Sequence, residues 1–166
     1  PDDAPELADL VNFAGEGLPL HFWMGMAAPG QDPWEIGRLR QADKAREGQI
    51  VVVEHAGRAI AGLTGYVIGP QPEPIGASFP AVIRPLQELG NLALSSWYVN
   101  VLACYPEQRG KGHGGRLLDV ADEIAESVGM TRMSVIVADN NTNARRLYER
   151  HGYREAAQRP CVRDGW

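Results

Sequence analysis

Residues 99–115 read Val-Asn-Val-Leu-Ala-Cys-Tyr-Pro-Glu-Gln-Arg-Gly-Lys-Gly-His-Gly-Gly, and an apolar-periodic stretch follows them at once. A β-rich run therefore leads into a loop with four glycines and two cations, and this loop opens a helix. The first N–H groups of a helix have no intrahelical partner and lie at its positive end, so they bind anions. Glycines let the backbone approach a phosphate, and Arg109 and Lys111 add full positive charges. The stretch predicts a pyrophosphate site.

Two patterns match this loop. Residues 110–115 satisfy G-x-G-x-x-G, and Asp139 follows about 25 residues later at the end of a predicted strand, as in dinucleotide-binding (Rossmann) proteins. Such a fold needs several further βα units after its first turn, but only 27 residues follow Asp139. The dinucleotide interpretation is therefore the weaker one.

The second pattern is Arg109-x-x-Gly112-x-Gly114, and it has a companion further along the chain. That companion is the run Asn141-Thr-Asn-Ala144-Arg-Arg-Leu147-Tyr148-Glu149, which leads to Gly152-Tyr153. In this order and spacing the two runs resemble the acyl-CoA-binding signatures of the GNAT superfamily of N-acetyltransferases. The resemblance covers residues 95–154 well and the rest of the chain only by the order of its elements. It implies that an amine attacks the thioester of acetyl-CoA directly and takes its acetyl group.

Two alternatives stay open beside this N-acetyltransferase interpretation. A non-catalytic acyl-CoA-binding or sensing module would keep the glycine loop and lack a catalytic base. A Rossmann-type dinucleotide-binding protein would bind NAD or NADP through the same loop.

Periodicity and turn residues predict the elements along the chain. We expect helices, strands and a loop in this order: a helix that begins at Asp2 or Asp3, a helix over 33–47 capped by Asp32, a hairpin of 49–55 and 59–68, a proline-rich loop over 69–79, a short helix within 80–94, a strand over 95–105, a helix over 112–128, a strand over 132–138, a helix over 142–151 and a strand over 153–158. This order implies an α/β (α+β), GNAT-like mixed sheet, antiparallel in its N-terminal half and parallel at its centre, with helices on both faces.

Length and composition limit the class of protein. The 166 residues are 44% hydrophobic and 22% charged, which fits one globular domain over residues 1–166. The net charge of −5 gives no overall basic field, so we expect no nucleic-acid partner. The two cysteines are an ordinary intracellular complement, and no apolar run approaches 18 residues, so we expect a cytoplasmic protein with no membrane partner. The expected partner is a small-molecule or peptide amine, and a homodimer is compatible with that.

The chain ends leave two questions open. Residue 1 is proline, so the sequence does not exclude an export signal before it. The opening residues 1–7 resemble the cap that follows the first strand of GNAT proteins, and the chain stops at Trp166, where that family has one more strand. We therefore expect the domain to lack the first and last strands of the family.

The resemblance assigns residues to the cofactor, acetyl-CoA. The backbone of the glycine loop would hold the pyrophosphate, and the preceding strand would pair with the pantetheine arm. A face of the 142–151 helix would lie beside the arm and the sulfur. The residues implied are Arg109, Gly110, Lys111, Gly112, His113, Gly114 and Gly115 for the pyrophosphate, Leu102, Ala103 and Cys104 for the pantetheine, and Asn141, Ala144 and Tyr148 for the helix face. Asn141 could instead be a helix cap, and Tyr148 a core aromatic residue.

Three residues are candidates for the chemistry. In the family the tyrosine equivalent to Tyr148 acts as the acid for the departing thiolate. Tyr98 stands where some members have a glutamate, but an unperturbed tyrosine is a poor base at neutral pH. We therefore expect a water relay or another carboxylate, with Glu35 as the first choice. Cys104 is expected to be a structural thiol and His113 to point to solvent, and the histidines show no metal-ligand spacing.

Overall fold

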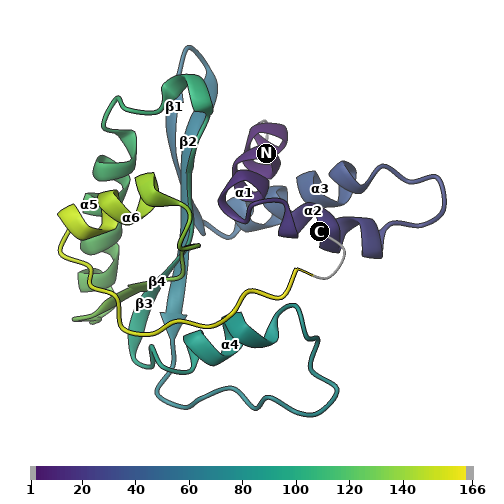
Figure 1. Cartoon of the computed structure of the whole chain (residues 1–166). Coiled ribbons are helices and arrows are strands. Elements are labelled where there is room, and N and C mark those ends of the chain that lie inside the picture. The colour runs from purple at the N-terminus through teal and green to yellow at the C-terminus, as the bar shows by residue number, and fades with distance from the viewer. Residues whose placement is uncertain (1–2, 164–166) are drawn as a thin grey trace. The chain divides into compact units, whose positions relative to one another are not determined.

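The computed structural model describes residues 3–163 and consists of helices around a mixed β-sheet (Figure 1). The elements are α1 (Ala4–Ala14), α2 (Leu18–Met26), α3 (Pro33–Arg46), β1 (Ile50–His55), β2 (Arg58–Ile68), α4 (Arg84–Gly90), β3 (Ser96–Cys104), the 3-10 turn η1 (Pro106–Gln108), α5 (His113–Ser127), β4 (Met133–Val135) and α6 (Thr142–Arg150).

The strands of the described residues form one sheet in the order β1-β2-β3-β4. β1 and β2 are an antiparallel hairpin, and β3 and β4 run parallel. Between β2 and β3 the N–H of Ser95 donates to the C=O of Gly69, and the N–H of Tyr105 donates to the C=O of Ile60. Residue numbers rise along one strand as they fall along the other, so this pair is antiparallel. The predicted mixed sheet is confirmed, and the antiparallel half excludes a doubly wound dinucleotide fold.

The described chain forms two compact units. The first consists of residues 3–65 and 100–117, and the second of residues 66–99 and 118–163. Strands β2 and β3 and helix α5 each continue from one unit into the other. Each unit is described in turn below.

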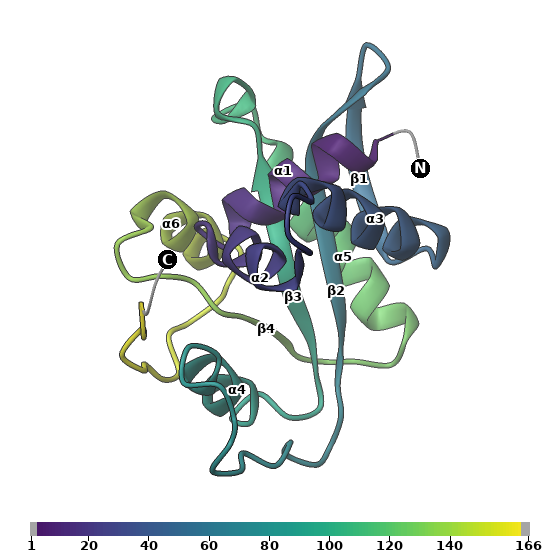
Figure 2. The same cartoon turned by 90° about the vertical axis from the view of Figure 1, so that its right-hand side faces the viewer.

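The first unit packs helices α1, α2 and α3 together beside the β1–β2 hairpin (Figures 1 and 2). α1 approaches the sheet at Gly62, where an added Cβ would lie 3.4 Å from a methyl carbon of Leu10. The glycine therefore allows close contact between helix and strand. The rings of Trp23 and Trp34 join α2 to α3 with centroids 5.5 Å apart.

The N-terminal ends of the three helices in this unit differ in how well the sequence predicted them. The carboxylate of Asp32 accepts from the N–H of Trp34 at 3.0 Å, as the sequence predicts for α3. Asp3 stands at the start of α1 without a side-chain cap hydrogen bond. α2 is a helix that the sequence showed only as an apolar stretch. It begins after Gly17, whose φ of +96° turns the chain into the helix, with Pro19 in the first turn.

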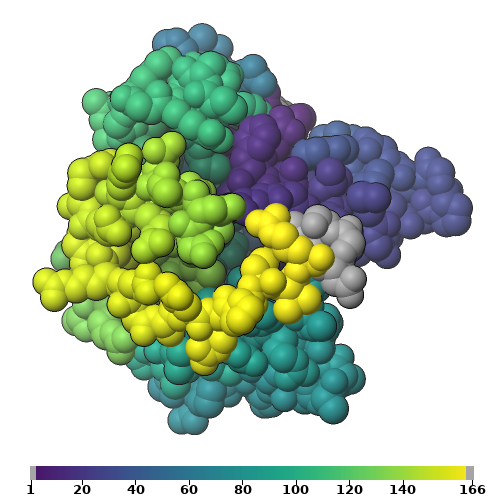
Figure 3. Space-filling view, in the orientation of Figure 1, coloured from purple at the N-terminus to yellow at the C-terminus, as the bar shows by residue number. Residues whose placement is uncertain are grey.

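The second unit contains α4, β4, α6 and the end of α5. Residues 153–163 follow α6 and run over the surface of this unit (Figure 3). Arg159 in this segment forms an ion pair with Glu88 of α4 at 2.8 Å. The prediction of a strand over 153–158 is wrong, because these residues form no strand. β4 has only three residues, Met133–Val135, and so offers almost no edge for another strand.

Two smaller expectations also need correction in this unit. The sequence predicts a buried strand over 132–138, but β4 is shorter and its residues are only half-buried. The predicted helix over 112–128 ends one residue early, at Ser127, and Val128 is 49% exposed.

We predict opposite effects for two glycine-to-alanine changes in helices of the first unit. At Gly37 a Cβ would lie 2.6–2.8 Å from ring atoms of Trp23, which is only 3% exposed. Gly37→Ala should therefore destabilise the protein by about 1–3 kcal/mol through overpacking. Gly25→Ala meets nothing within 4 Å and should stabilise it by up to about 1 kcal/mol through helix propensity. Urea unfolding measures both, and equal effects would contradict the close packing at Gly37.

Candidate functional site

The glycine loop links β3 to α5 in the first unit, through η1 and residues 109–112. Gly110 and Gly112 have φ angles of +76° and +86°, a region that side-chain-bearing residues rarely adopt. The N–H of Arg116 donates to the C=O of Gly112 at 3.2 Å, which is the first hydrogen bond of the helix. The N–H groups of residues 113–115 precede this bond and are the unpaired donors of the helix start. The loop therefore has the backbone geometry of an anion site.

Both cations of the loop are exposed and tied to it. The Nε of Arg109 donates to the C=O of Cys104 at 3.4 Å, and the Nζ of Lys111 donates to Oε1 of Gln108 at 2.8 Å. These bonds hold two positive charges beside the helix start, where the helix dipole has the same sign. An anion at this position meets charge from the side chains and from the backbone together.

A pocket of about 390 Å³ borders the loop within the same unit. Most of its lining side chains are polar, and several of them carry N–H groups. The lining residues are Val53, Glu54, His55, Ile60, Gln108, Lys111, His113 and Arg116. The Nδ1 of His113 is buried and has no hydrogen-bond partner among the described residues. The expectation that His113 points to solvent is therefore wrong. His113 is the first residue of α5, and its side chain lies in the lining of this pocket.

The pairing of β3 with β4 stops short of the glycine loop, and at the end of β3 the C=O of Cys104 accepts from the Nε of Arg109. The register with β4 pairs Trp97 with Met133 and ends where Val99 pairs with Val135, but β3 continues to Cys104. Leu102, Ala103 and Cys104 lie beyond this register and are half-buried. Unpaired N–H and C=O groups on a strand edge can accept an extended guest. The sequence could not show where the pairing stops.

The thiol of Cys104 does not have the properties of a nucleophile. Burial raises its pKa, and the nearby Arg109 and Lys111 oppose this rise without reversing it. A thiol with a raised pKa is less ionised at neutral pH and reacts poorly. This supports the expectation of a structural thiol.

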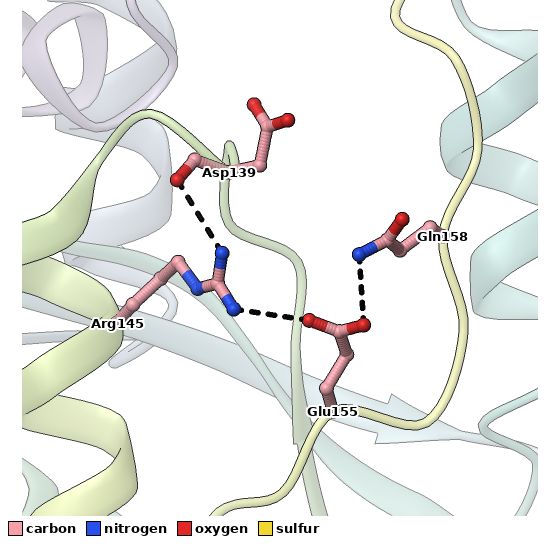
Figure 4. Close-up of polar contacts among 4 residues, drawn as sticks. All are labelled: Asp139, Arg145, Glu155 and Gln158. Carbon is pink, nitrogen blue, oxygen red and sulfur yellow. Dashed lines mark hydrogen bonds and ion pairs between the residues drawn. The ribbon is translucent and has the colours of Figure 1, made fainter.

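Helix α6 belongs to the second unit, and its first turn is fixed by side chains. The Oδ1 of Asn141 accepts from the N–H of Ala144 at 3.2 Å, so the cap interpretation of Asn141 is confirmed. Arg145 donates to the C=O of Asp139 and forms a 3.1 Å ion pair with Glu155, to which Gln158 also donates (Figure 4). Contact of Asn141 and Ala144 with a cofactor stays a prediction.

Tyr148 lies on the same helix and is only 8% exposed. Its ring packs on that of Tyr153 with centroids 5.5 Å apart. Burial raises the pKa of Tyr148 to about 12, so its phenol keeps the proton at neutral pH. The burial and the ring contact fit the core-aromatic interpretation, and the role of Tyr148 as acid for the thiolate stays a prediction.

Tyr98 lies in the same unit and interacts electrostatically with Tyr148. Burial is the first cause of a raised pKa for Tyr98, and the neighbouring phenols Tyr66 and Tyr148 add to it. A base must lose its proton near the working pH, and this shift goes the other way. The structure thus argues against Tyr98 as the base and places it as a neutral neighbour of Tyr148.

Tyr66 was missed by the sequence analysis. Its ring contacts that of Tyr98 with centroids 5.3 Å apart and an interplanar angle of 65°. The only signal for it was its place in an alternating strand, because the loop between β2 and β3 hides which residues face each other.

Glu35 and the possible metal ligands are the remaining candidates from the sequence. Glu35 is exposed in the first turn of α3, in the first unit, and its role as base stays a prediction. Among residues 3–163 no group of three or more His, Cys, Asp or Glu side chains could hold a metal ion. No helix in the same range is both long and apolar enough to cross a membrane.

Two curated relatives match part of the chain. The N-acetyltransferase YycN of Bacillus subtilis (strain 168), itself uncharacterized, is 39% identical over 51 residues, which are 31% of this chain and 33% of YycN. The uncharacterized N-acetyltransferase YhfO of the same organism is 39% identical over 59 residues, or 36% of this chain and 40% of YhfO. The matched stretches thus span well under half the length of either relative.

Solved structures share the fold over most of the chain. A crystal structure of an acetyltransferase has a TM-score of 0.60 at 21% identity, covering 94% of this chain and 87% of its own. A predicted acetyltransferase from Clostridium acetobutylicum, crystallised with acetyl-CoA, has a TM-score of 0.51 at 15% identity, covering 99% and 89%. At these identities the similarity concerns the fold alone.

A family model extends the similarity to sequence. The model described as Acetyltransferase (GNAT) family matches residues 20–153, which include the glycine loop and the Asn141–Tyr148 run. Because this match covers most of the chain, the chain belongs to the Acetyltransferase (GNAT) family.

Proposed function

We propose that the chain moves an acetyl group from acetyl-CoA to a primary amine. The observation that carries this proposal is the loop with left-handed Gly110 and Gly112, which opens α5 and carries Arg109 and Lys111 just before the helix start. Family membership supports acetyl transfer in general, and the crystallised relative from Clostridium acetobutylicum was solved with acetyl-CoA.

The cofactor would use three features of the chain. The pyrophosphate would bind the N–H groups at the start of α5, assisted by Arg109 and Lys111. The pantetheine arm would pair with β3 at residues 102–104, beyond the register with β4, and would replace the contact of Arg109 with the C=O of Cys104. Asn141, Ala144 and Tyr148 share a face of α6 and would lie beside the arm. No metal enters this scheme.

The reaction balances without any other reagent. The lone pair of the neutral amine attacks the thioester carbon, a C–N bond forms, and the C–S bond breaks to release the thiolate of CoA. The amine loses one proton to a base and the thiolate takes one from water, so the net products are an amide and a thiol. Tyr148 would donate its O–H to the sulfur as negative charge develops there.

The raised pKa of Tyr148 makes this role more specific. Full proton transfer from a phenol of pKa about 12 to an ordinary thiolate of pKa about 8.5 is uphill by about 5 kcal/mol. A hydrogen bond to the thiolate needs no such transfer and is strengthened in a buried site. Tyr148 therefore stabilises the leaving group as a donor, and desolvation of the thiolate brings the two pKa values closer together.

Proton removal from the amine needs a separate group. Tyr98 is unsuited because its pKa is raised. We propose a water relay that delivers the proton to Glu35, whose carboxylate is exposed on α3. The same property of Tyr98 favours the second candidate function, an acyl-CoA-binding module without catalysis, and release of CoA from acetyl-CoA across a panel of amines separates the two.

The setting we propose is cytoplasmic. Cys104 and Cys161 are free thiols, which suits a reducing compartment. The acceptor would be a small molecule or a peptide amine, and the chain would act as a single domain, alone or as a homodimer.

We expect acetyl-CoA to raise the melting temperature of the full chain, and NADH to leave it unchanged. A ligand at 100 times its dissociation constant adds about 2.7 kcal/mol of stability.

Gly112→Ala should reduce the affinity for acetyl-CoA at least tenfold, because the new Cβ disfavours the φ of +86° on which the loop depends. Gly129→Ala is the matched control, since its φ is +75° and it lies at the far end of α5.

Calorimetry of both folded variants measures the difference. Equal affinity in Gly112→Ala and Gly129→Ala would place the anion site elsewhere. Stabilisation by NADH but not by CoA would contradict the proposed cofactor.

Tyr148→Phe should lower the single-turnover rate of acetylation about 10²-fold or more, with little change in acetyl-CoA affinity. The phenylalanine ring keeps the packing and loses only the O–H donor. The control is Tyr153→Phe, which removes a phenol from the adjoining ring and should leave the rate within about twofold of the parent. Parent rates in Tyr148→Phe would remove the donor from the mechanism and favour the non-catalytic module.

A further inference from the structure

Tyr66 on β2 and Tyr98 on β3 form a cross-strand aromatic pair within the second unit. The N–H of Ser95 bonds to the C=O of Gly69, and counting along the antiparallel strands from this bond brings residue 66 opposite residue 98. The ring centroids are 5.3 Å apart at an angle of 65°, an edge-to-face contact. The two side chains therefore stand on the same face of the sheet.

This pair is covered at one end and open at the other. Tyr66 is 53% exposed, and Tyr98 is half-buried. An exposed aromatic ring that rests on a second ring is a preformed apolar surface, because its position is fixed by the contact.

Tyr98, the less exposed member of the pair, interacts with Tyr148, the residue that would assist the reaction. The phenol of Tyr98 interacts electrostatically with those of both Tyr66 and Tyr148. The aromatic pair and Tyr148 thus interact within this unit. If Tyr148 donates to the thioester sulfur, an acceptor on the pair must reach the neighbouring thioester carbon.

The surface is neutral. The pKa values of Tyr66, Tyr98 and Tyr148 are raised first by burial, and within residues 3–163 the ionisable groups that act on Tyr98 are the other two phenols. A carboxylate, Asp122, acts on Tyr153, whose ring packs on that of Tyr148. Among the described residues the aromatic pair thus has no acidic partner for a second or third ammonium group.

A neutral aromatic surface also favours the reactive form of an amine. Desolvation disfavours the ammonium ion and lowers its pKa, whereas a neighbouring carboxylate would hold the amine protonated. An aromatic body on the acceptor gains from ring contacts, and a polyamine gains nothing from them while losing hydration of its charges.

We propose that Tyr66 and Tyr98 form the acceptor-binding wall and that the acceptor is a primary monoamine with an aromatic body. This inference rests on the proposed acetyl transfer and adds the class of amine to it. Tyr66 is a specificity residue that touches the body of the acceptor, and the reacting nitrogen lies toward Tyr148.

The test compares 2-phenylethylamine with spermidine as acceptors, using the full chain and acetyl-CoA. We expect kcat/KM to be at least tenfold higher for 2-phenylethylamine. Tyr66→Ala should raise the KM for 2-phenylethylamine at least tenfold and leave the KM for acetyl-CoA unchanged. Tyr66→Phe keeps the ring and should stay within about twofold of the parent. Val67→Ala is the matched control, because Val67 is 44% exposed on the opposite face of the same strand.

Calorimetric binding of 2-phenylethylamine to the CoA-loaded protein separates this inference from the proposed function. Binding that Tyr66→Ala abolishes, without turnover of either amine, supports the wall and overturns acetyl transfer. Turnover that prefers spermidine, or equal effects of Tyr66→Ala and Val67→Ala, overturns the wall and leaves acetyl transfer intact. Absence of binding by 2-phenylethylamine to the loaded protein overturns the wall as well.

Discussion

β4 pairs with β3 through only three residues, and several other features of the chain depend on this short contact. Beyond Val99 the strand β3 continues to Cys104 without that partner, and residues 102–104 are where we propose that the pantetheine arm binds. Residues 153–163 form no strand, and Arg145 and Arg159 form the ion pairs of that part of the chain with Glu155 and Glu88. Tyr98 sits at the middle of the paired stretch, where its backbone is fixed.

Local signals in the sequence were sufficient where a residue acts on its own neighbours. Asp32 before Pro33 marks the start of α3, and Asn141 caps α6 through the N–H three residues later. The glycine loop and the α5 helix were likewise predicted, because positive φ angles at Gly110 and Gly112 leave glycine as the favoured residue. The family signatures added the cofactor, which no periodicity contains.

Features that depend on distant residues could not be predicted. The register of β2 with β3 follows a long loop, so nothing local brings Tyr66 opposite Tyr98. The residue at which the β3–β4 pairing ends depends on tertiary packing. Whether residues 153–158 form a strand depends on tertiary packing as well. The inward turn of His113 was missed because loop glycines around it suggest exposure, whereas the helix already begins at that residue.

The buried phenols have a consequence for how the fold responds to alkali. Burial raises the pKa of Tyr98, Tyr148 and Tyr153 in one unit and of Tyr105 in the other, where Tyr105 also donates to Asp9 at 2.8 Å. The unfolded chain releases these protons near pH 10, while the folded chain still holds them. Folding is therefore linked to proton uptake only on the alkaline side. The protonated phenols make their full contribution to the free energy of unfolding below about pH 10. This contribution is lost as the pH rises through the pKa values that these groups have in the folded chain.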